Sequence, residues 1–517
     1  MGEDRGFGRN RTIIAAGAVA VLLCGCALPP ATEGWTPPAW SDAVGISAAD
    51  AQPGEGQELN DLGFVQGRIR NDAAGYQARY VEIPGAAEFN SRIEALIRGP
   101  LDGVDFQPEA FAVGSGLGER GCVPGSMDWD AERVLSDPAT GPVAGTGTAI
   151  TCEVIAAFGT TVGVALRTVT GSGGSPQSDQ KTTLYVDLST GAVTDSTQLW
   201  TPQAAADLWT RAMEYLRRQS GGLSAAPLQP PADEQVALAA QAFGYTTERD
   251  DGSFVLTLPR GLASPELAGL GIDQTAEPTT LAVSGDVAAN WQSDQAASVY
   301  AQQGTAFTGL PQWTPGSTPI DCALLSCVAV TYDDGPGPYT IQLLDTLRAE
   351  QAGATFFEQG INVQSNPDIT KAVVEAGQEI GSHTMTHADL TKIPLSGAVA
   401  EVNRAADLIA GVTGRPVTLY RPPYGATNSA VLGAVGKPAI LWSIDTNDWQ
   451  NPGPQALIDR SVPVAKPGAI ILFHDVHVDS VTTAPQILEG LADRGFTMVT
   501  VSQLFGGSVP QGVVRNR

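Results

Sequence analysis

Hydrophobic positions in the last third of this 517-residue chain recur in short runs that alternate with longer amphipathic stretches. Seven strand-like runs begin at Val328, Ala354, Glu379, Thr418, Ala439, Ala469 and Phe496. Most of the intervals between them can hold a helix, as over 339–350, 395–409 and 483–494. This alternation predicts an α/β fold with a parallel sheet, closed as a barrel or doubly wound, whose chemistry gathers at the carboxyl ends of the strands.

The region from about 61 to 306 has a mixed pattern instead. Residues 148–158 and 161–168 are strand-like, and 202–218 form an amphipathic helix with Ala, Leu, Trp and Met on one face. We therefore expect an α+β accessory domain over 61–306, with a candidate division into two subdomains near the Pro- and Gly-bearing stretch 220–233. This region contains no His, and its acids show no metal-ligand spacing.

Composition sets the remaining boundaries. Residues 307–321 are rich in Gly, Pro, Thr and Ser, which predicts a linker. The regular strand–helix pattern then fills 322–506, and 507–517 is left as a C-terminal tail. Two or three domains also agree with the length of the chain.

The N-terminus predicts export. Three arginines precede an apolar run over 12–23, which ends in Leu23-Cys24-Gly25-Cys26. A basic region, an apolar core and small residues are typical of a signal peptide, here over 1–26. The Leu-x-Gly-Cys ending resembles a lipobox, which implies cleavage before Cys26, a lipid on its thiol and anchoring on the extracytoplasmic face of the membrane. The alternative is a transmembrane anchor, but the run is shorter than the ~20 residues that a span needs. Residues 27–60 are expected to be a flexible tether.

Cysteine usage agrees with an exported protein. Four cysteines remain after the signal region, and an even number in an exported chain suggests disulfides. Of the three possible pairings we favour Cys122–Cys152 and Cys322–Cys327, because each pair then lies within one folding unit. The alternative is four reduced, buried thiols.

The charge of the chain restricts its partners. Acidic residues outnumber basic residues 55 to 29, and the net charge is −26. This balance argues against nucleic acid and against an anionic membrane surface as direct partners. Membrane contact is therefore expected only through the N-terminal lipid. No pattern in the chain indicates an oligomeric state.

The most informative stretch is the apolar run from Cys327, which ends in Asp333-Asp334-Gly-Pro. Two neighbouring carboxylates at the end of a buried strand repel each other and lose hydration, and a cation between them offsets both costs. The alternative is a solvated Asp-Gly-Pro turn. All four histidines of the chain, at 383, 387, 474 and 477, lie in the same region. A His-x-x-x-His pair together with one carboxylate can form a metal site with open positions.

Five segments at the predicted strand ends, taken together, resemble the polysaccharide deacetylases of carbohydrate esterase family 4. They are Thr331-Tyr-Asp-Asp-Gly, Ser382-His-Thr-Met-Thr-His, Arg421-Pro-Pro-Tyr, Asp445-Thr-Asn-Asp-Trp and Leu472-Phe-His-Asp. The resemblance covers about 327–505. It implies a distorted (β/α) barrel, often with seven strands. Residues 81–85 and 187–191 also resemble part of the accessory domain of some bacterial cell-wall deacetylases.

The resemblance implies a role for each matching residue. Asp333 would be the general base, held by Arg421, and His474 the general acid, with its pKa tuned by Asp448. The metal ligands would be Asp334, His383 and His387. The Tyr424 backbone N–H would stabilise the oxyanion, and Trp449 and Leu472 would line the acetyl pocket. Structural alternatives are an ion pair for Arg421, and a capping acid beside a core aromatic residue for Asp448 and Trp449. His477 is left outside the site.

The expected function is metal-dependent hydrolysis of N-acetyl groups on a cell-wall glycan, most simply peptidoglycan N-acetylglucosamine. Two His and one Asp suit Zn²⁺, and also Co²⁺ or Mn²⁺. Alternatives are deacetylation of chitooligosaccharide or acetylxylan, hydrolysis of another amide, and a non-catalytic envelope lipoprotein that binds glycans.

Overall fold

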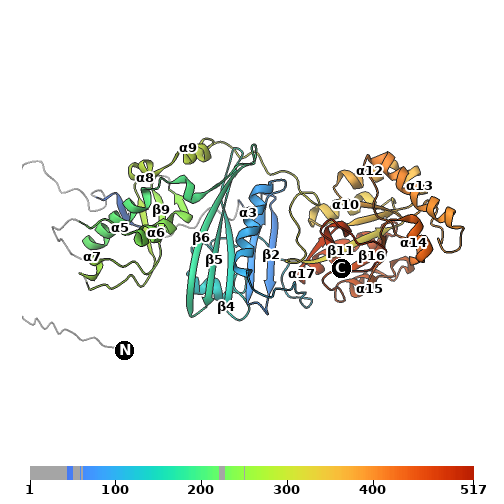
Figure 1. Cartoon of the computed structure of the whole chain (residues 1–517), viewed down its shortest axis with the longest axis horizontal. Coiled ribbons are helices and arrows are strands. Elements are labelled where there is room, and N and C mark those ends of the chain that lie inside the picture. The colour runs from blue at the N-terminus through green and yellow to red at the C-terminus, as the bar shows by residue number, and fades with distance from the viewer. Residues whose placement is uncertain (1–43, 50–58, 60–61, 220–227, 250, 270) are drawn as a thin grey trace, which may run out of the picture.

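The computed structural model describes residues 44–49, 59, 62–219, 228–249, 251–269 and 271–517. The predicted signal peptide, the lipidation site Cys26 and most of the predicted tether lie outside the described residues. Within these ranges, no helix combines the length and apolar character that crossing a membrane requires. Three folded units follow one another along the molecule (Figure 1): an outer unit (44–49 and 196–300), a middle unit (62–195) and a barrel (322–517).

The middle unit is a six-stranded sheet with a helix on one face. Its strands are β2 (Val65–Asn71), β3 (Tyr76–Glu82), β4 (Thr146–Phe158), β5 (Thr161–Ser172), β6 (Ser175–Asp187) and β7 (Val193–Asp195). They lie in chain order, and every neighbouring pair is antiparallel except β3 and β4. Helix α3 (Ala87–Arg98) buries Phe89, Ile93 and Ile97, four residues apart, in the core of this sheet. Two short helices, η1 (Gly99–Leu101) and α4 (Ala131–Ser136), complete the unit.

The outer unit is a smaller sheet packed with helices. Its strands run in the order β1 (Ile46–Ala48), β10 (Thr279–Val283), β9 (Phe254–Leu258) and β8 (Thr246–Glu248), all antiparallel. The helices are η2 (Ser196–Leu199), α5 (Ala204–Gln219), α6 (Asp233–Ala240), η3 (Gln241–Gly244), α7 (Pro265–Ala268), α8 (Gly285–Trp291) and α9 (Asp294–Tyr300). Helix α5 buries Leu208, Trp209 and Met213 in the same core as β9 and β10.

These units differ from the predicted accessory domain in two respects. The first sheet ends with β7 at Asp195, so the division falls before α5 and not near 220–233. The reason is that α5 buries its apolar face in the outer core, which places it with the residues that follow it. In addition, Ile46–Ala48, predicted to be tether, pairs with β10 and belongs to the outer unit.

The barrel alternates parallel strands with helices, as the sequence predicts. Its strands are β11 (Ser326–Asp333), β12 (Thr355–Glu358), β13 (Glu379–Ser382), β14 (Ala439–Ile440), β15 (Ile444–Asp445), β16 (Ile470–His474), β17 (Phe496–Val499) and β18 (Val513–Val514). Its helices are α10 (Thr340–Ala349), α11 (Gly360–Ser365), α12 (Pro367–Glu375), α13 (Leu395–Thr413), η4 (Pro423–Gly425), α14 (Ser429–Val435), η5 (Asp448–Gln450), α15 (Pro454–Ser461), α16 (Val478–Thr482), α17 (Ala484–Asp493) and α18 (Val501–Leu504).

The sheet closes into a distorted barrel. The strand order is β13-β12-β11-β16-β15, and β17 pairs with the start of β11. Tyr420 bridges Ser382 at the end of β13 to Ala439 in β14. The chain then continues from β14 to β15, which pairs with β16, so the chain connection and not a strand pair joins the two ends here. The expected (β/α) barrel is confirmed, and the strand near Thr418 is reduced to a single bridging residue.

The predicted C-terminal tail is part of the barrel. Val513–Val514 forms β18, which pairs in parallel with β14, and Asn516 bridges to Ala469. This segment therefore covers the gap beside β14 and β16. The sequence signal was weak because only two residues of the segment are strand, and their pairing is non-local.

Alternation along β11 decides which side chains face the interior of the barrel. Val328, Val330 and Tyr332 pack with helices α10 and α17. Thr331 and Asp333 point to the opposite side, where both contact Arg421. The register places Asp333 beside His474 of β16, so two predicted catalytic residues lie on adjacent strands.

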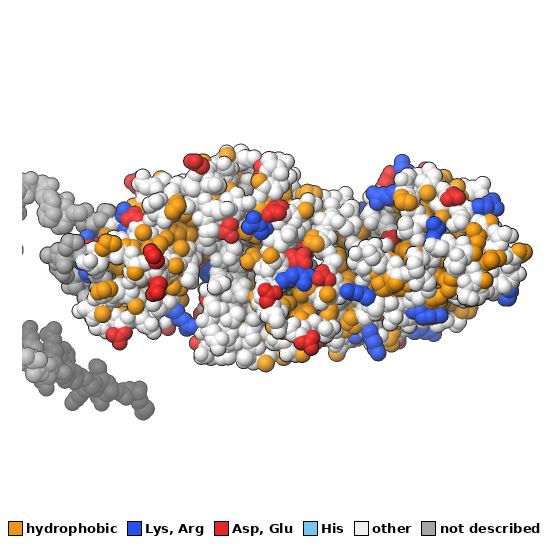
Figure 2. Space-filling model, in the orientation of Figure 1, with side chains coloured by type: hydrophobic (Ala, Val, Ile, Leu, Met, Phe, Trp, Pro, Cys, Tyr) orange, Lys and Arg blue, Asp and Glu red, His pale blue; other side chains and the backbone are white. Residues whose placement is uncertain are grey.

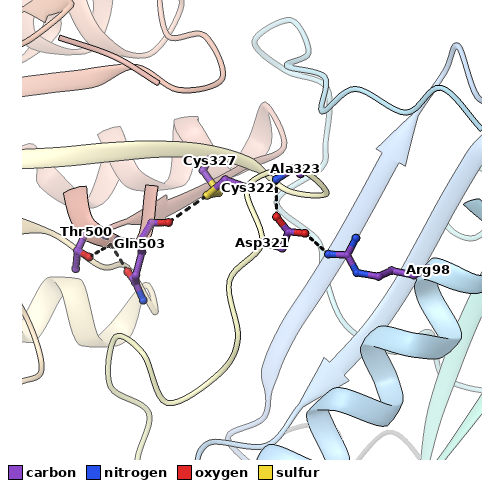
Figure 3. The surroundings of a disulfide bond; sticks show 7 residues. All are labelled: Arg98, Asp321, Cys322, Ala323, Cys327, Thr500 and Gln503. Atoms are coloured by element: carbon purple, nitrogen blue, oxygen red, sulfur yellow. Dashed lines mark hydrogen bonds and ion pairs between the residues drawn. A yellow bond between two sulfur atoms is a disulfide. The ribbon is translucent and has the colours of Figure 1, made fainter. Parts of the chain in front are cut away.

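Both predicted disulfides are confirmed. Cys122–Cys152 links a loop of the middle unit to β4, and Cys322–Cys327 ties the end of the linker to β11 (Figure 3). Charge is distributed unevenly in the view of Figure 2: most of the visible Lys and Arg side chains lie over the barrel, and Asp and Glu are prominent over the other two units.

Candidate active site

The carboxyl ends of the barrel strands bring the predicted site residues together. Asp333 ends β11 and His474 ends β16, while His383 directly follows β13. Parallel strands in register expose these ends at one edge, as sequence reasoning expected.

Asp334, His383 and His387 form a cluster that could hold a metal ion. One ligand atom from each lies within 4.8 Å of the others. The Nε2 atoms of His383 and His387 are each 3.5 Å from Oδ1 of Asp334. Burial opposes ionisation of Asp334, but the charges of three nearby histidines and a hydrogen bond from Gln359 hold its pKa below the usual value.

Hydrogen bonds at the other ring nitrogens aim both histidines at this point. Nδ1–H of His383 donates to the Arg421 carbonyl oxygen at 2.8 Å, so that Nε2 is the ring nitrogen directed at the cluster. His387 Nδ1 lies 3.1 Å from the Tyr424 hydroxyl oxygen. Burial and the charge of His383 lower the pKa of His387, which favours its neutral, ligating form. The donor set therefore fits a divalent transition metal.

The backbone at the site adopts unusual conformations. Asp334, Thr384, His387 and Tyr424 all have φ between 60° and 70°, the left-handed region that non-glycine residues rarely occupy. Such conformations cost free energy and persist where surrounding contacts enforce them. Here they turn the chain sharply after each strand, so that the side chains return toward the strand ends.

Asp333 is held by a buried arginine. Its Oδ1 accepts from Arg421 Nη1 at 2.8 Å, and its Oδ2 lies 3.7 Å from His383 Nε2. Arg421 is fully buried and also donates to Thr331 Oγ1 and to the carbonyl oxygens of Ile440 and Leu441. Because the guanidinium is fixed from several sides, the Asp333 carboxylate has a defined orientation toward the metal-ligand cluster.

His474 and Asp448 form a second buried pair. His474 Nδ1 donates to Asp448 Oδ1 at 2.8 Å, and His474 Nε2 lies 4.0 Å from Asp334 Oδ2. Burial alone would lower the pKa of His474, but the hydrogen bond and charge of Asp448, with the charges of Asp333 and Asp334, raise it to about 9. His474 can therefore carry a proton at neutral pH, with Nε2 directed into the site.

The remaining predicted residues surround this centre. Tyr424 and Trp449 are 71% and 53% exposed, unusual values for large aromatic side chains, whereas Leu472 is 3% exposed. Leu472 lies two residues before His474 on β16 and therefore on the same face of the strand. The Tyr424 ring packs edge-on against His387, a contact that the predicted backbone role did not include.

Several residues at the site were missed by the sequence analysis. Gln359 donates to Asp334 at 2.5 Å and follows β12, the one early strand end to which no role was given. Ser480 donates to Asp448 at 2.5 Å. Asp475 is fully buried beside Gly335, accepts from Thr340, and has its pKa raised to about 7, mainly by burial. The adjacency of Asp475 to His474 was the available signal. His477, left outside the site, has its ring 5.7 Å from that of His474.

Comparison with known proteins agrees with this geometry. Residues 323–438 match the family model for polysaccharide deacetylase. A peptidoglycan-N-acetylglucosamine deacetylase of Bacillus cereus is 39% identical over 186 residues, covering 34% of this chain and 87% of the relative. The chain therefore belongs to the polysaccharide deacetylase family.

Other matches also cover about a third of this chain. The peptidoglycan-N-acetylmuramic acid deacetylase PdaC of Bacillus subtilis is 36% identical over 178 residues, or 34% of this chain, and the match spans 38% of its own length. A solved structure of T48 deacetylase with substrate is 43% identical, covers 38% of this chain and 99% of that chain, and has a TM-score of 0.37. The chain therefore spans well under two thirds of the length of PdaC.

Proposed function

We propose that the chain is a metal-dependent N-deacetylase of cell-wall amino sugars, with peptidoglycan N-acetylglucosamine as the first candidate substrate. The observation that carries the proposal is the convergence of three groups at one barrel edge: the Asp334–His383–His387 cluster, the Asp333–Arg421 pair and the His474–Asp448 pair. A site that only bound glycan would have no need for a fixed carboxylate base opposite a protonated histidine.

In the proposed mechanism the metal cluster and the two pairs act on the acetyl group together. A divalent cation, with Zn²⁺ the first candidate and Co²⁺ or Mn²⁺ the alternatives, would acidify water and polarise the acetyl carbonyl. Asp333, oriented by Arg421, accepts the proton of the attacking water. The Tyr424 backbone N–H donates to the oxygen of the tetrahedral intermediate. His474 then donates its Nε2 proton to the departing amine, and Asp448 stabilises the charged ring before that step. The products are acetate and a free amino sugar.

The substrate and the location are supported by independent observations. The B. cereus and B. subtilis relatives are named for peptidoglycan N-acetylglucosamine and N-acetylmuramic acid, respectively. The N-terminal signal and the Leu-x-Gly-Cys26 ending would hold the enzyme by a lipid beside the wall. Trp449 and Leu472 would line the acetyl pocket. Chitooligosaccharide and acetylxylan remain the alternative substrates for the same chemistry.

The test is acetate release from purified peptidoglycan by the chain from Ala27, which keeps every described residue. Asp333→Asn should abolish release while retaining the metal, because it removes the base and no ligand. His387→Ala should lose both activity and metal, measured by elemental analysis. Acetate release from chitooligosaccharide but not from peptidoglycan would keep the reaction and change the substrate assignment to chitooligosaccharide. If the metal-loaded protein released acetate from no acetylated glycan, the proposed enzymatic activity would be contradicted and a glycan-binding lipoprotein would be favoured.

A further inference from the structure

We infer that the middle unit is a spacer clamped to the barrel, which fixes the direction of the catalytic edge without contributing to it. The inference concerns the middle unit, which lies outside the residues that the family model matches, and it goes beyond the proposed deacetylation. It depends on where the middle unit touches the barrel, how those contacts are made, and where the chain enters the molecule.

The principal contact is a loop of the middle unit, residues 111–120, which we call the clamp. It holds the turn between α17 and β17. The Asp493 carboxylate, at the end of α17, accepts from the backbone N–H groups of Gly114, Ser115 and Gly116 at 2.7, 3.1 and 2.7 Å. Three donors converging on one carboxylate make a specific, charge-assisted contact.

The backbones of the clamp and the turn are also joined. Phe111 N–H donates to the Arg494 carbonyl oxygen at 3.1 Å, and Leu117 N–H donates to that of Asp493 at 3.1 Å. Arg494, which is 7% exposed, returns a hydrogen bond from Nε to the Phe111 carbonyl oxygen at 2.6 Å. Arg120 Nη2 donates to the Phe496 carbonyl oxygen at 2.5 Å. Hydrogen bonds therefore run in both directions across the interface.

Further contacts prevent rotation about the clamp. Arg98, at the end of α3, pairs with Asp321 directly before the Cys322–Cys327 disulfide (Figure 3). Gln351 Nε2 donates to the Phe64 carbonyl oxygen at 3.1 Å. In the linker, the Ser317 carbonyl oxygen accepts from the N–H of Gly85 in the middle unit at 2.8 Å. Contacts at several separated points hold two bodies in one orientation.

The residues of the barrel and of the end of the linker in these contacts precede or begin strands. Asp321 precedes β11, Gln351 precedes β12, and residues 492–496 precede or begin β17. The catalytic residues instead follow β11, β13 and β16. An eight-residue strand such as β11 separates the two edges by roughly 20–25 Å. The middle unit therefore neither covers the catalytic edge nor lines it.

The entry point of the chain completes the argument. β1, the first described strand, belongs to the outer unit, which lies at the end of the molecule opposite the barrel (Figure 1). Whatever holds the chain before β1 is thus separated from the barrel by both units. With the proposed lipid anchor, this arrangement would carry the catalytic edge away from the membrane and toward the wall.

The interface combines these polar contacts with apolar ones, since Leu324 of the barrel is buried in the core of the middle unit and Ala110 packs against the barrel core. A cavity of about 480 Å³ lies between the units, lined by Glu82 and Arg120 of the middle unit, Trp313 of the linker, and Gln351 and Gln503 of the barrel. Because such a volume is too large and polar to stay dry, apolar burial contributes less here than in a closed interface. Substitutions that remove the hydrogen bonds between the clamp and the barrel are therefore expected to loosen the orientation without unfolding either unit.

The experiment compares Asp493→Ala with Glu489→Ala in the chain from Ala27. Glu489 is an exposed acid one turn earlier on α17, and no hydrogen bond or ion pair joins it to the clamp residues that the structure describes, so it is a matched control. Asp493→Ala should accelerate amide hydrogen exchange over 111–117 at least about tenfold, because three charge-assisted bonds are lost. Small-angle X-ray scattering should show a broader distribution of maximum dimensions. Glu489→Ala should change neither quantity.

A second variant, Asp493→Ala/Arg120→Ala, removes two sets of clamp contacts at once, in case the single substitution has too small an effect to measure. If circular dichroism shows that this variant is folded, and both hydrogen exchange and scattering match those of the unsubstituted chain, the clamp does not fix the orientation of the two units. Turnover of a soluble chitooligosaccharide then tests the spacer role. Unchanged turnover supports a spacer, a rise would indicate a cover, and a loss would indicate a shared substrate site; the last two overturn the inference. Exchange and scattering need no turnover, so they decide the clamp even if the proposed deacetylase activity fails.

Discussion

The middle unit and the barrel both bury charged side chains, but they satisfy them in opposite ways. In the middle unit, Arg79 donates hydrogen bonds to the carbonyl oxygens of Gly121 and Arg120. Arg167 likewise donates to the Asp179 carboxylate and to loop carbonyl oxygens. In the barrel, Arg421 and Asp448 hold partners whose other atoms stay directed at a common point. A buried charge therefore indicates a catalytic site only when it leaves a reactive atom free.

Backbone strain divides the two regions in the same way. All seven non-glycine residues with positive φ in the described part of the chain lie in the barrel, and four of them belong to the site or flank its ligands. In the middle unit, the described residues with positive φ are glycines, which adopt that conformation at little cost. The barrel thus accepts strain where side chains must converge, and the middle unit uses glycine where the chain only has to turn.

The largest expected effect is on kcat, and it distinguishes a buried cationic residue of the barrel from one of the middle unit. His474→Gln should lower kcat about 10²–10⁴-fold, because it removes the proposed general acid. Lys181→Gln in the middle unit should leave kcat unchanged, although burial lowers the pKa of Lys181 to about 8. Initial rates of acetate release at saturating substrate measure both. An equal loss in Lys181→Gln would break the comparison and give the middle unit a catalytic role.

The disulfides should contribute unequally to stability. Cys122–Cys152 closes 30 residues and Cys322–Cys327 closes five, and chain-entropy loss grows with loop length. Replacing both cysteines by Ala should cost about 3–4 kcal/mol for the first pair and about 2 kcal/mol for the second. Denaturant titration of each double variant, with separate probes for the middle unit and the barrel, measures the difference. Equal losses would show that loop closure does not govern these bonds.

Tyr424→Phe should weaken metal binding by about 10–100-fold, because His387 loses the hydrogen-bond partner of its Nδ1. Competition with a chromogenic chelator reports the dissociation constant without turnover. Tyr339→Phe is the control, since Tyr339 is a barrel tyrosine beside α10 and outside the ligand set. An unchanged constant in Tyr424→Phe would mean that the hydroxyl does not orient His387.

The smallest expected effect is a shift in the pH profile. His474 must carry a proton to act as the acid, so activity should fall as pH rises through its pKa, which lies at about 9. Asp448→Asn removes the charge that raises this pKa, and the alkaline limb should move to lower pH. The pH dependence of kcat measures the shift. If the alkaline limb of the pH profile did not shift in Asp448→Asn, the proton donor would be a group other than His474.

Much of the barrel could be predicted because its signals are local. Each strand carries its own apolar run, and Asp333, His383, Arg421, Asp448 and His474 each lie at or just beyond a strand end. Because the carboxyl ends of parallel strands lie at one edge of the sheet, residues that follow different strands come together in one site. The disulfide pairs followed from similar reasoning, since each joins cysteines within one unit.

Contacts between distant segments could not be predicted. β1 pairs with β10 across more than two hundred residues, and β18 adds to the barrel from the predicted tail. Neither segment has a distinctive local pattern, because a strand of two or three residues gains its stability from its partner and not from its own sequence. The division between the outer and middle units was misplaced for the same reason.

The sequence by itself determined the class of fold of the barrel and the residues available for chemistry, and it favoured the pairing that the four disulfide cysteines adopt. Only the tertiary structure decided that Gln359 and Tyr424 contact the proposed metal ligands, that the units form a row, and that the clamp contacts the barrel on the side away from the site. The physical reason is that side-chain type and local periodicity are written along the chain, whereas orientation depends on free energies summed over contacts between distant residues.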